Sequence, residues 1–369
     1  MMKILHFYEQ LRGGGIGAMI AGLANAQRRK AQVEVCLIYE VDDRDIFAKK
    51  LDPEVSFNSL HKEEGRITIK DLIDIFLHIK RGGYDVVNLH AHFYRFMLPI
   101  ILLHRSVKFF YTVHSEASKE NCRFDNYLLP LKKFCFKRKW LIPVTISHES
   151  QDSFRKLYNC NSLLIYNGVP RPVIDDKCGN IVQQYRLTSS TRVFLHPGRI
   201  CDAKNQVVLC RVFERLIDEG YDVVLLMAGS NQDDAIMQSL QPYFRNERIK
   251  YLGEVENVPQ LLAHSDGMCL PSIYEGMPCT LLEAFAVGCI PVCTPVGGIK
   301  DTVVDGSNGF LAASPAFEDY LHAMKRMLAA PHDEIKRMRL QCKASFEKFD
   351  IDIVAENYIK HYQAACNSR

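Results

Sequence analysis

EGMPCTLLEA, at residues 275–284, is the stretch from which the fold of this chain can be worked out. Proline starts a helix readily at its first position, because its missing N–H would have no partner there anyway. Pro278 therefore predicts a helix that runs to about Val287. Glu275 then lies in the loop before this helix, and Glu283 lies roughly one and a half turns inside it. Two short apolar runs on either side, Gly267–Leu270 and Ile290–Cys293, predict buried strands, so the stretch belongs to a βαβ unit.

The loop at residues 275–278 places backbone N–H groups at the positive end of the predicted helix. Such a helix start is a ready site for an anion such as a diphosphate. Glu275 and Glu283 stand on either side of that position, and their carboxylates can hold sugar hydroxyls. A ligand with a diphosphate between hydroxyl-bearing groups, as in a nucleotide-sugar, fits this layout.

The same alternation of strand and helix extends along the whole chain. Before residue 170, apolar runs predict strands at Lys3–Tyr8, Val33–Tyr39, Val86–Leu89, Phe109–Val113 and Leu141–Ile146. Between them, helical periodicity predicts helices at Ile16–Lys30 and Ile69–Arg81. Further strands are predicted after residue 190, at Arg192–His196, Val223–Ala228, Ile249–Tyr251, Gly267–Leu270 and Ile290–Cys293. This rhythm predicts an α/β fold with parallel sheets covered by helices.

A break in the rhythm marks the boundary between two domains. Gly168-Val169-Pro170-Arg171-Pro172 and a polar stretch separate the two series of strands. We expect two Rossmann-like domains, residues 1–172 and 173–345, followed by a C-terminal helix at 346–369 that returns to the first domain. Two such domains would face a central cleft at the carboxyl ends of their strands, where ligands bind in α/β proteins.

The composition narrows the class of protein. The 369 residues are 47% hydrophobic, enough to bury the cores of two domains, and the net charge of +3 is too small to argue for nucleic acid. The 13 cysteines form no CxxC pair and no His/Cys metal spacing, which indicates reduced thiols in a cytosol. The N-terminus lacks the apolar run of a signal peptide, and no segment reaches the ~20 apolar residues of a membrane span. We therefore expect a cytoplasmic protein.

Two cations follow the first predicted strand of the second domain. Gly198-Arg199 ends that strand and Lys204 precedes the next helix, at a position where a ligand would lie. A leaving nucleoside diphosphate gains negative charge as its glycosidic bond breaks, and fixed cations there lower the barrier. The alternative is that both are solvated surface residues, but their position together with the glutamate loop favours the functional interpretation.

A glycine loop follows the first predicted strand. Gly13-Gly14-Gly15-Ile16-Gly17-Ala18 matches G-x-G-x-x-A, with Glu34 or Glu40 as a candidate ribose carboxylate of a dinucleotide site. Residues 9–12 separate the loop from the strand, which disfavours that assignment. We prefer a loop whose amides, including those of Gly14 and Gly15, approach a phosphate or an acceptor; a plain strand-to-helix turn stays open.

Several histidines follow predicted strands. His114 comes directly after Phe109–Val113 and is a candidate either to hydrogen-bond a bound sugar or to act as an acid or base near neutral pH; the alternative is a structural role at the strand end. His90 and His92 have i, i+2 spacing that would suit a metal, but no third ligand is evident, so structural or acceptor-side roles are favoured.

A basic and aromatic segment lies at residues 132–140. If helical, it would be a candidate for contact with an anionic membrane surface; the alternative is a solvated charged face. Its cations are Lys132, Lys133, Lys137, Arg138 and Lys139, and it holds the only tryptophan, Trp140.

Taken together, these motifs resemble the large retaining glycosyltransferase family 4, which has the GT-B fold, in particular the enzymes of capsular and exopolysaccharide biosynthesis. The likeness covers nearly the whole chain and is strongest from Phe194 to Phe310. The motifs that carry it are the glycine loop, His114, Asn167-Gly168-Val169, Gly198-Arg199, Lys204-Asn205, Tyr251-Leu252-Gly253, Pro271-Ser272, the Glu275–Glu283 element and Gly297-Gly298. The Glu-x7-Glu element with Glu-Gly-x-Pro is specific in this context, whereas the glycine loop alone is not.

The resemblance implies a role for each matching residue. The first domain would be the acceptor side and the second the nucleotide-sugar donor side. Glu275 would contact the donor sugar, Glu283 the ribose, and Arg199 with Lys204 the diphosphate. His114 of the first domain would contact a far hydroxyl of the donor sugar. The other residues implied to bind the donor are Gly276, Met277, Pro278 and Leu282 around the helix start, Gly198, and Gly253, Val255 and Glu256 near the base.

The resemblance also implies catalysis with retention, without a bound metal or other cofactor. The motif Asp350-Ile351-Asp352 has the form used by metal-dependent sugar transferases, but its place in the C-terminal helical region indicates solvated surface. The chain departs from the family at Cys279, where bulkier apolar residues are common, and at Glu116, since an Asp often follows the histidine.

The sequence thus predicts a hexosyltransferase. It would move a hexose or N-acetylhexosamine from a nucleoside-diphosphate sugar, UDP-sugar favoured over GDP-mannose, to a lipid-linked or oligosaccharide acceptor at the cytoplasmic face, in bacterial cell-surface polysaccharide synthesis. The alternatives are a UDP-sugar epimerase of the same fold, a non-catalytic nucleotide-sugar binding protein and a dehydrogenase. The acidic pair and the two cations favour transfer over all three.

Overall fold

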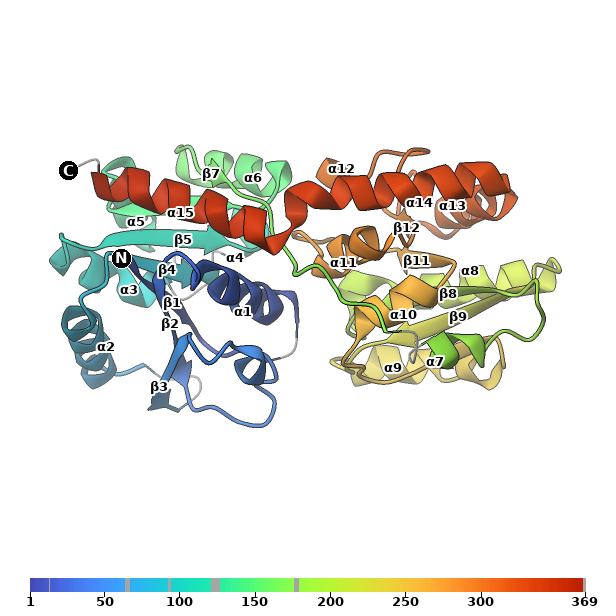
Figure 1. Ribbon diagram of the computed structural model, residues 1–369, viewed down its shortest axis with the longest axis horizontal. Helices are drawn as coiled ribbons and strands as arrows, with labels where there is room; N and C mark the ends of the chain where they lie inside the picture. The colour runs from blue at the N-terminus through green and yellow to red at the C-terminus, as the bar shows by residue number, and fades with distance from the viewer. Residues whose placement is uncertain (13, 64–66, 92–93, 121–126, 176–178, 368–369) are drawn as a thin grey trace. The chain divides into compact units, whose positions relative to one another are not determined.

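Two parallel β-sheets organise the chain, one in each of two units (Figure 1). The computed structural model describes residues 1–367 except for 13, 64–66, 92–93, 121–126 and 176–178. Unit 1 comprises Met1–Pro170 and Phe349–Arg369, and unit 2 comprises Arg171–Lys348.

Unit 1 is built on a seven-stranded sheet with the order β3-β2-β1-β4-β5-β6-β7, in which all paired strands are parallel. Its strands are β1 (Lys3–Tyr8), β2 (Gln32–Tyr39), β3 (Ser56–Lys62), β4 (Val86–His90), β5 (Lys108–Val113), β6 (Leu141–Thr145) and β7 (Leu163–Leu164). Its helices are α1 (Gly15–Gln27), α2 (Ile69–Gly82), α3 (Tyr94–Leu103), α4 (Ala117–Glu120), α5 (Leu129–Lys137), α6 (His148–Tyr158) and α15 (Ile351–Asn367).

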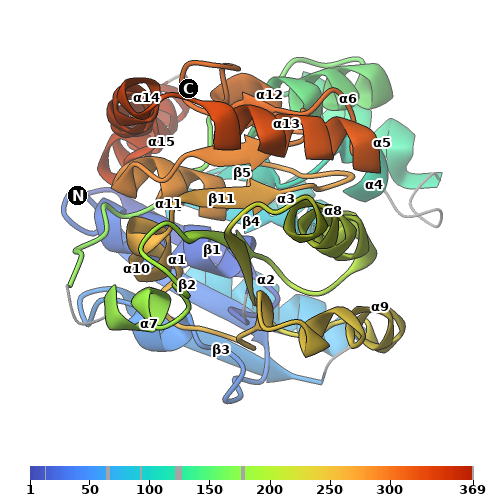
Figure 2. The same cartoon turned by 90° about the vertical axis from the view of Figure 1, so that its right-hand side faces the viewer.

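Unit 2 has a six-stranded parallel sheet with the order β10-β9-β8-β11-β12-β13, flanked by helices on both faces (Figure 2). Its strands are β8 (Arg192–Pro197), β9 (Val223–Ala228), β10 (Ile249–Tyr251), β11 (Gly267–Leu270), β12 (Pro291–Cys293) and β13 (Phe310–Leu311). Its helices are α7 (Gly179–Gln183), α8 (Gln206–Asp218), α9 (Asp234–Leu240), α10 (Val258–His264), α11 (Cys279–Val287), α12 (Ile299–Thr302), α13 (Phe317–Ala329) and α14 (His332–Phe346).

Local sequence explains why these elements begin, end and pack as they do. Every residue of β4 and of β9 is buried, as expected for parallel strands covered on both faces. Helix α2 starts with a reciprocal capping box between Thr68 and Asp71 and ends at Gly83, which takes the left-handed conformation. Helix α15 returns to unit 1 and packs against α1 (Figure 1).

The structure confirms the predicted α/β fold with two Rossmann-like parallel sheets. The predicted strands differ from the observed ones by a residue at most, but β3, β7 and β13 were not predicted. Strand β3 lies at the sheet edge with mostly exposed residues, so it lacks the apolar run that marked the others. Helix α1 also ends at Gln27 rather than at Lys30.

The expected role of Pro278 within the helix is corrected. Pro278 takes the N-cap position with φ −70° and ψ 115°, an extended conformation, and α11 begins at Cys279. The predicted helix is otherwise confirmed through Val287, because the αL residue Gly288 ends it.

Candidate functional site

Glycines join the loops at the carboxyl edge of the unit 2 sheet. The Gly198 N–H after β8 donates to the Ala228 carbonyl at 2.8 Å, and the Gly229 N–H donates to the Gly253 carbonyl at 2.8 Å. A Cβ at Gly229, whose φ is +152°, would lie 2.1 Å from the Gly198 carbonyl oxygen, so only glycine fits there. Gly198 and Gly253 are thus brought together through Gly229, and Val255 follows in the same half-buried loop.

Glu275 and Lys204 form an ion pair at this edge. The Lys204 Nζ lies 2.6 Å from the Glu275 Oε1, and the side chains are only 14% and 10% exposed. The Ser272 hydroxyl donates to the same oxygen at 2.6 Å. Each charge is therefore compensated by the other, and the pair fixes the loop after β11 against the short helical turn at residues 202–204.

A pair of glycines supports the glutamate loop from the other side. A Cβ at Gly297, whose φ is +54°, would lie 2.1 Å from the Glu275 carbonyl oxygen. The Gly298 N–H donates to the Gly276 carbonyl at 2.6 Å, and a Cβ at Gly298 would lie 2.6 Å from the Met277 Cε. Gly297 and Gly298 thus support the glutamate loop through contacts that only glycine allows.

Helix α11 begins beside the ion pair. Its first N–H groups point out of the N-terminus, which carries the positive end of the helix dipole. Leu282 is buried and anchors the helix, while Glu283 is half-buried one turn after Cys279. An anion next to the Lys204 ammonium would meet a second source of positive potential here.

Arg199 lies on the same edge but takes no part in the ion pair. Its side chain is exposed, and its Nη1 donates to the Gln232 Oε1 at 2.9 Å. Its backbone carbonyl accepts a hydrogen bond from the Gln206 amide at 2.7 Å, which fixes the loop after β8. The structure thus brings Lys204 and Glu275 together and leaves the Arg199 guanidinium facing solvent.

His196 was not predicted as a site residue. It is fully buried, its Nδ1 lies 2.8 Å from the Cys269 carbonyl oxygen, and burial lowers its pKa to about 4. The neutral ring must therefore donate from Nδ1, which leaves a lone pair on Nε2 beneath Gly198. Its position at the end of a strand before Pro-Gly-Arg was the only signal in the sequence.

His114 lies at the end of β5 in unit 1. Its backbone N–H donates to the Glu120 Oε1 at 2.7 Å, and the Ser115 N–H donates to the same oxygen at 2.9 Å. Burial lowers the pKa of the His114 imidazole to about 3, so the ring is neutral near pH 7. The structure therefore favours the hydrogen-bonding role of His114 over the acid–base role near neutral pH.

The metal-type spacing of His90 and His92 gains no support. The ring nitrogens of His90 lie 3.1 Å from His6 Nδ1 and 3.1 Å from His114 Nε2, so both are engaged. His92 lies outside the described residues.

The glycine loop in unit 1 leads directly into α1. Gly14 occupies the N-cap with φ +129°, a conformation that glycine adopts readily, and Gly15 is the first helical residue. Gly13 lies outside the described residues. The dinucleotide alternative is not supported at Glu34, because this residue lies near the start of β2 rather than at its carboxyl end.

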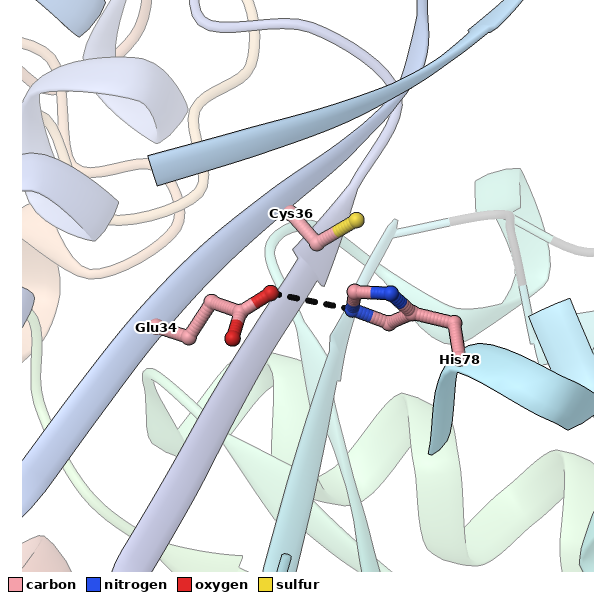
Figure 3. Close-up of side chains that lie close together, drawn as sticks. All are labelled: Glu34, Cys36 and His78. Carbon is pink, nitrogen blue, oxygen red and sulfur yellow. Dashed lines mark ion pairs between the residues drawn. The ribbon is translucent and has the colours of Figure 1, made fainter. Parts of the chain in front are cut away.

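Glu34, Cys36 and His78 form the one group in the described part of the chain whose spacing suits a metal ion (Figure 3). The Glu34 Oε1 lies 2.9 Å from the His78 Nε2, and the Tyr84 hydroxyl donates to the Glu34 Oε2 at 2.6 Å. Burial raises the pKa of the Cys36 thiol, which disfavours the thiolate that binds metals. Each carboxylate oxygen of Glu34 thus has a partner, one in α2 and one in the loop after it, and these contacts link β2 to α2.

Not all five cations of the basic segment lie on the surface of the protein. Lys132 is fully buried in α5, so the expectation that it faces a membrane surface is wrong. Lys133 is half-buried, and Lys137, Arg138 and Lys139 are exposed at the turn before β6. Among the described residues, no helix is both long and apolar enough to cross a membrane.

Two family models match the chain, one in each unit. Residues 13–171 match "Glycosyltransferase Family 4", and residues 179–345 match "Glycosyl transferases group 1". Together these matches span most of the sequence, and the second contains the Lys204–Glu275 pair.

Curated relatives are distant and partly aligned. N-acetyl-alpha-D-glucosaminyl L-malate synthase of Bacillus anthracis is 27% identical over 174 residues, which is 46% of this chain and 45% of that protein. Glycogen synthase of Pseudomonas syringae pv. tomato is 27% identical over 179 residues, 47% of this chain and 36% of that protein. The chain spans less than half of the length of these relatives.

Solved structures share the fold over the whole chain. Anabaena Alr3699/HepE, solved with UDP and glucose, aligns with a TM-score of 0.82 at 18% identity, covering 99% of this chain and 100% of that one. A glycosyltransferase from Rickettsia africae ESF-5 aligns with a TM-score of 0.83 at 17% identity, covering 100% and 99%. At these identities the likeness establishes the fold.

Proposed function

Because the chain belongs to glycosyltransferase family 4, we propose that it transfers a sugar from a nucleoside diphosphate to an acceptor hydroxyl. The observation that carries this proposal is the Lys204–Glu275 ion pair at the carboxyl edge of unit 2, beside the start of α11. A diphosphate bound there would meet the Lys204 ammonium and the helix N-terminus, and its sugar would lie against the Glu275 carboxylate.

The proposed chemistry uses these groups in the bond-breaking step. As the bond between the sugar C1 and the phosphate oxygen breaks, negative charge grows on the diphosphate, and Lys204 with the α11 dipole stabilises it. The exposed Arg199 guanidinium can exchange Gln232 for the diphosphate. Glu275 orients the sugar while C1 gains positive character. The acceptor oxygen bonds to C1 on the same face, its proton passes to the departing phosphate oxygen, and the configuration is retained.

We further propose a UDP-sugar donor carrying a hexose or N-acetylhexosamine. The fold relatives support this choice, since Anabaena Alr3699/HepE was solved with UDP and with UDP-glucose. The acceptor is proposed to be an oligosaccharide or a lipid-linked glycan of a bacterial cell-surface polysaccharide. The relatives named N-acetyl-alpha-D-glucosaminyl L-malate synthase and glycogen synthase make different products by name, so the acceptor requires its own test.

The decisive experiment measures nucleotide release and sugar transfer. The purified chain is incubated with UDP-, GDP- and ADP-sugars, with and without a panel of glycan and lipid-linked acceptors, and products are identified by mass spectrometry. We expect acceptor-dependent release of UDP and a product heavier by one sugar. Donor turnover without an acceptor product would favour the epimerase, and binding without turnover would favour a nucleotide-sugar binding protein; either result overturns the proposal.

A further inference from the structure

Three buried histidines form a hydrogen-bonded row across the unit 1 sheet. His6 lies in β1, His90 ends β4 and His114 follows β5, and they are 0%, 0% and 7% exposed. The His6 Nδ1 lies 3.1 Å from the His90 Nε2, and the His90 Nδ1 lies 3.1 Å from the His114 Nε2. Successive rings stack with centroids 5.4 Å apart and an angle of 28°.

All three rings are neutral at physiological pH. Burial lowers the pKa of His6 to about 4, that of His114 to about 3, and that of His90 well below its usual value. A neutral imidazole carries one N–H and one lone pair. Because both nitrogens of His90 form hydrogen bonds, one must donate and the other accept, so the two ring-to-ring hydrogen bonds run in the same direction. The hydrogen-bond partner at one end of the row therefore determines which nitrogen is protonated in the ring at the other end.

Gln27, the last residue of α1, fixes the first end. Its Oε1 lies 2.7 Å from the His6 Nε2, and its side chain is fully buried. The carbonyl oxygen of Gln27, rather than its amide nitrogen, faces the His6 ring, so Gln27 accepts a hydrogen bond from the His6 Nε2. In agreement, this hydrogen bond raises the pKa of His6 against the larger effect of burial, as expected when the ring donates.

This direction fixes the tautomer of every ring in the row. The proton of His6 is on Nε2, so its Nδ1 accepts from the His90 Nε2, and the His90 Nδ1 accepts from the His114 Nε2. The His114 Nδ1 is then a lone pair. It is buried and has no hydrogen-bond partner among the described residues.

We propose that Gln27, His6 and His90 are positioning residues that hold His114 as the Nε2–H tautomer, so that its Nδ1 accepts a hydrogen bond from a ligand hydroxyl. This assignment rests on the proposed function for the nature of the ligand, a sugar whose hydroxyl donates to His114. A ligand that offers only an acceptor at that position, such as a fluorine or a carboxylate, would face the lone pair and be rejected.

The tautomer can be measured without any ligand or activity. Long-range ¹H–¹⁵N spectra of the ¹⁵N-histidine-labelled chain at pH 7 report which nitrogen of each ring is protonated, with the signals assigned by single histidine substitutions. We expect a protonated Nε2 and an unprotonated Nδ1 for His114. In Gln27→Met the anchoring acceptor is removed, and we expect His114 to show both tautomers. A protonated Nδ1 in the unmodified chain, or a His114 signal unchanged by Gln27→Met, overturns the proposal.

Steady-state kinetics test whether the histidine row affects binding of the donor sugar. His90→Phe keeps a stacked ring but breaks both hydrogen bonds, and we expect KM for the donor to rise about 5–30-fold, the value of one buried hydrogen bond. His104→Phe is the matched control, because His104 is also a buried unit 1 histidine, bonded to the Phe76 carbonyl outside the row. Equal effects of the two substitutions would contradict the positioning role. If the unmodified chain transfers no sugar, the proposed function fails, while the spectra still decide the tautomer.

Discussion

Single residues at the carboxyl edge of unit 2 carry the proposed chemistry, and the Lys204–Glu275 pair is the most informative of them. Both side chains are largely shielded from water, so the loss of one partner leaves the other charge uncompensated. The same two side chains therefore hold the loops at this edge in place and supply the charges of the proposed reaction.

Glu275→Gln keeps the size of the side chain and removes its charge. We expect transfer to fall on the order of 10²–10³-fold, because the sugar loses its carboxylate and Lys204 is left without its counter-ion. Initial rates with a saturating UDP-sugar check this expectation. Glu247→Gln, an exposed residue of the same unit, is the control, and near-normal transfer by Glu275→Gln would remove Glu275 from the mechanism.

Gly297→Ala tests whether the glycine pair supports the glutamate loop. The new Cβ would lie 2.1 Å from the Glu275 carbonyl oxygen, so the loop must shift. Gly306→Ala is a control with a similar positive φ of +72° and open space around the Cβ, so it bears only the conformational cost of about 1–2 kcal/mol. We expect Gly297→Ala to lower unfolding free energy more than the control and to abolish donor-induced thermal stabilisation. Equal shifts for both variants would show that the loop does not depend on Gly297.

At the scale of elements, the row has one histidine in β1, one at the end of β4 and one directly after β5, and each takes up a proton less readily in the folded chain than in the unfolded one. The folded pKa values of His6 and His114, about 4 and about 3, lie below the ordinary value of 6.5. Their contribution to stability is thus complete above pH 6.5 and is lost as the pH falls from 6.5 toward 4.

Unfolding free energies at pH 7 and pH 5 test this expectation. Each such histidine lowers the free energy of unfolding by at most about 1.4 kcal/mol for each pH unit below 6.5. We expect His90→Phe to lose less stability than the unmodified chain over this interval, because one titrating group is gone. Urea unfolding followed by circular dichroism provides the measurement, and identical pH slopes would mean that the row does not resist protonation.

At the scale of the whole molecule, the chain leaves unit 1 after Pro170, builds unit 2 and returns to unit 1 as α15. This helix buries Val354, Tyr358 and Tyr362 within unit 1, and Arg29 of unit 1 pairs with Asp352 at 2.7 Å. The C-terminus is thus part of the first core rather than an appendage of the second unit.

Tyr358→Ala should therefore weaken unit 1 alone. The loss of a buried aromatic side chain typically costs about 3–5 kcal/mol. Calorimetry is expected to show one transition at lower temperature and a second, from unit 2, unchanged. Ile353→Ala, at an exposed position of the same helix, serves as the control. An unchanged lower transition in Tyr358→Ala would contradict the assignment of α15 to the core of unit 1.

The sequence by itself determined the two parallel sheets, because strands buried on both faces appear as continuous apolar runs. It also placed Glu275 in the loop before a helix, because Pro278 marks the start of that helix. It also predicted residues at the ends of strands, where parallel sheets gather their loops.

Only the tertiary structure decided which of these residues have partners. Strand order places β1 beside β4 and β4 beside β5, with His6 opposite Asn88 and His90 opposite Thr112, so each histidine lies two residues beyond the position facing the one before it. Lys132 became a core residue and Gly297 a support for Glu275 for the same reason. Local patterns determine secondary structure, whereas hydrogen-bond partners depend on which distant segments pack side by side.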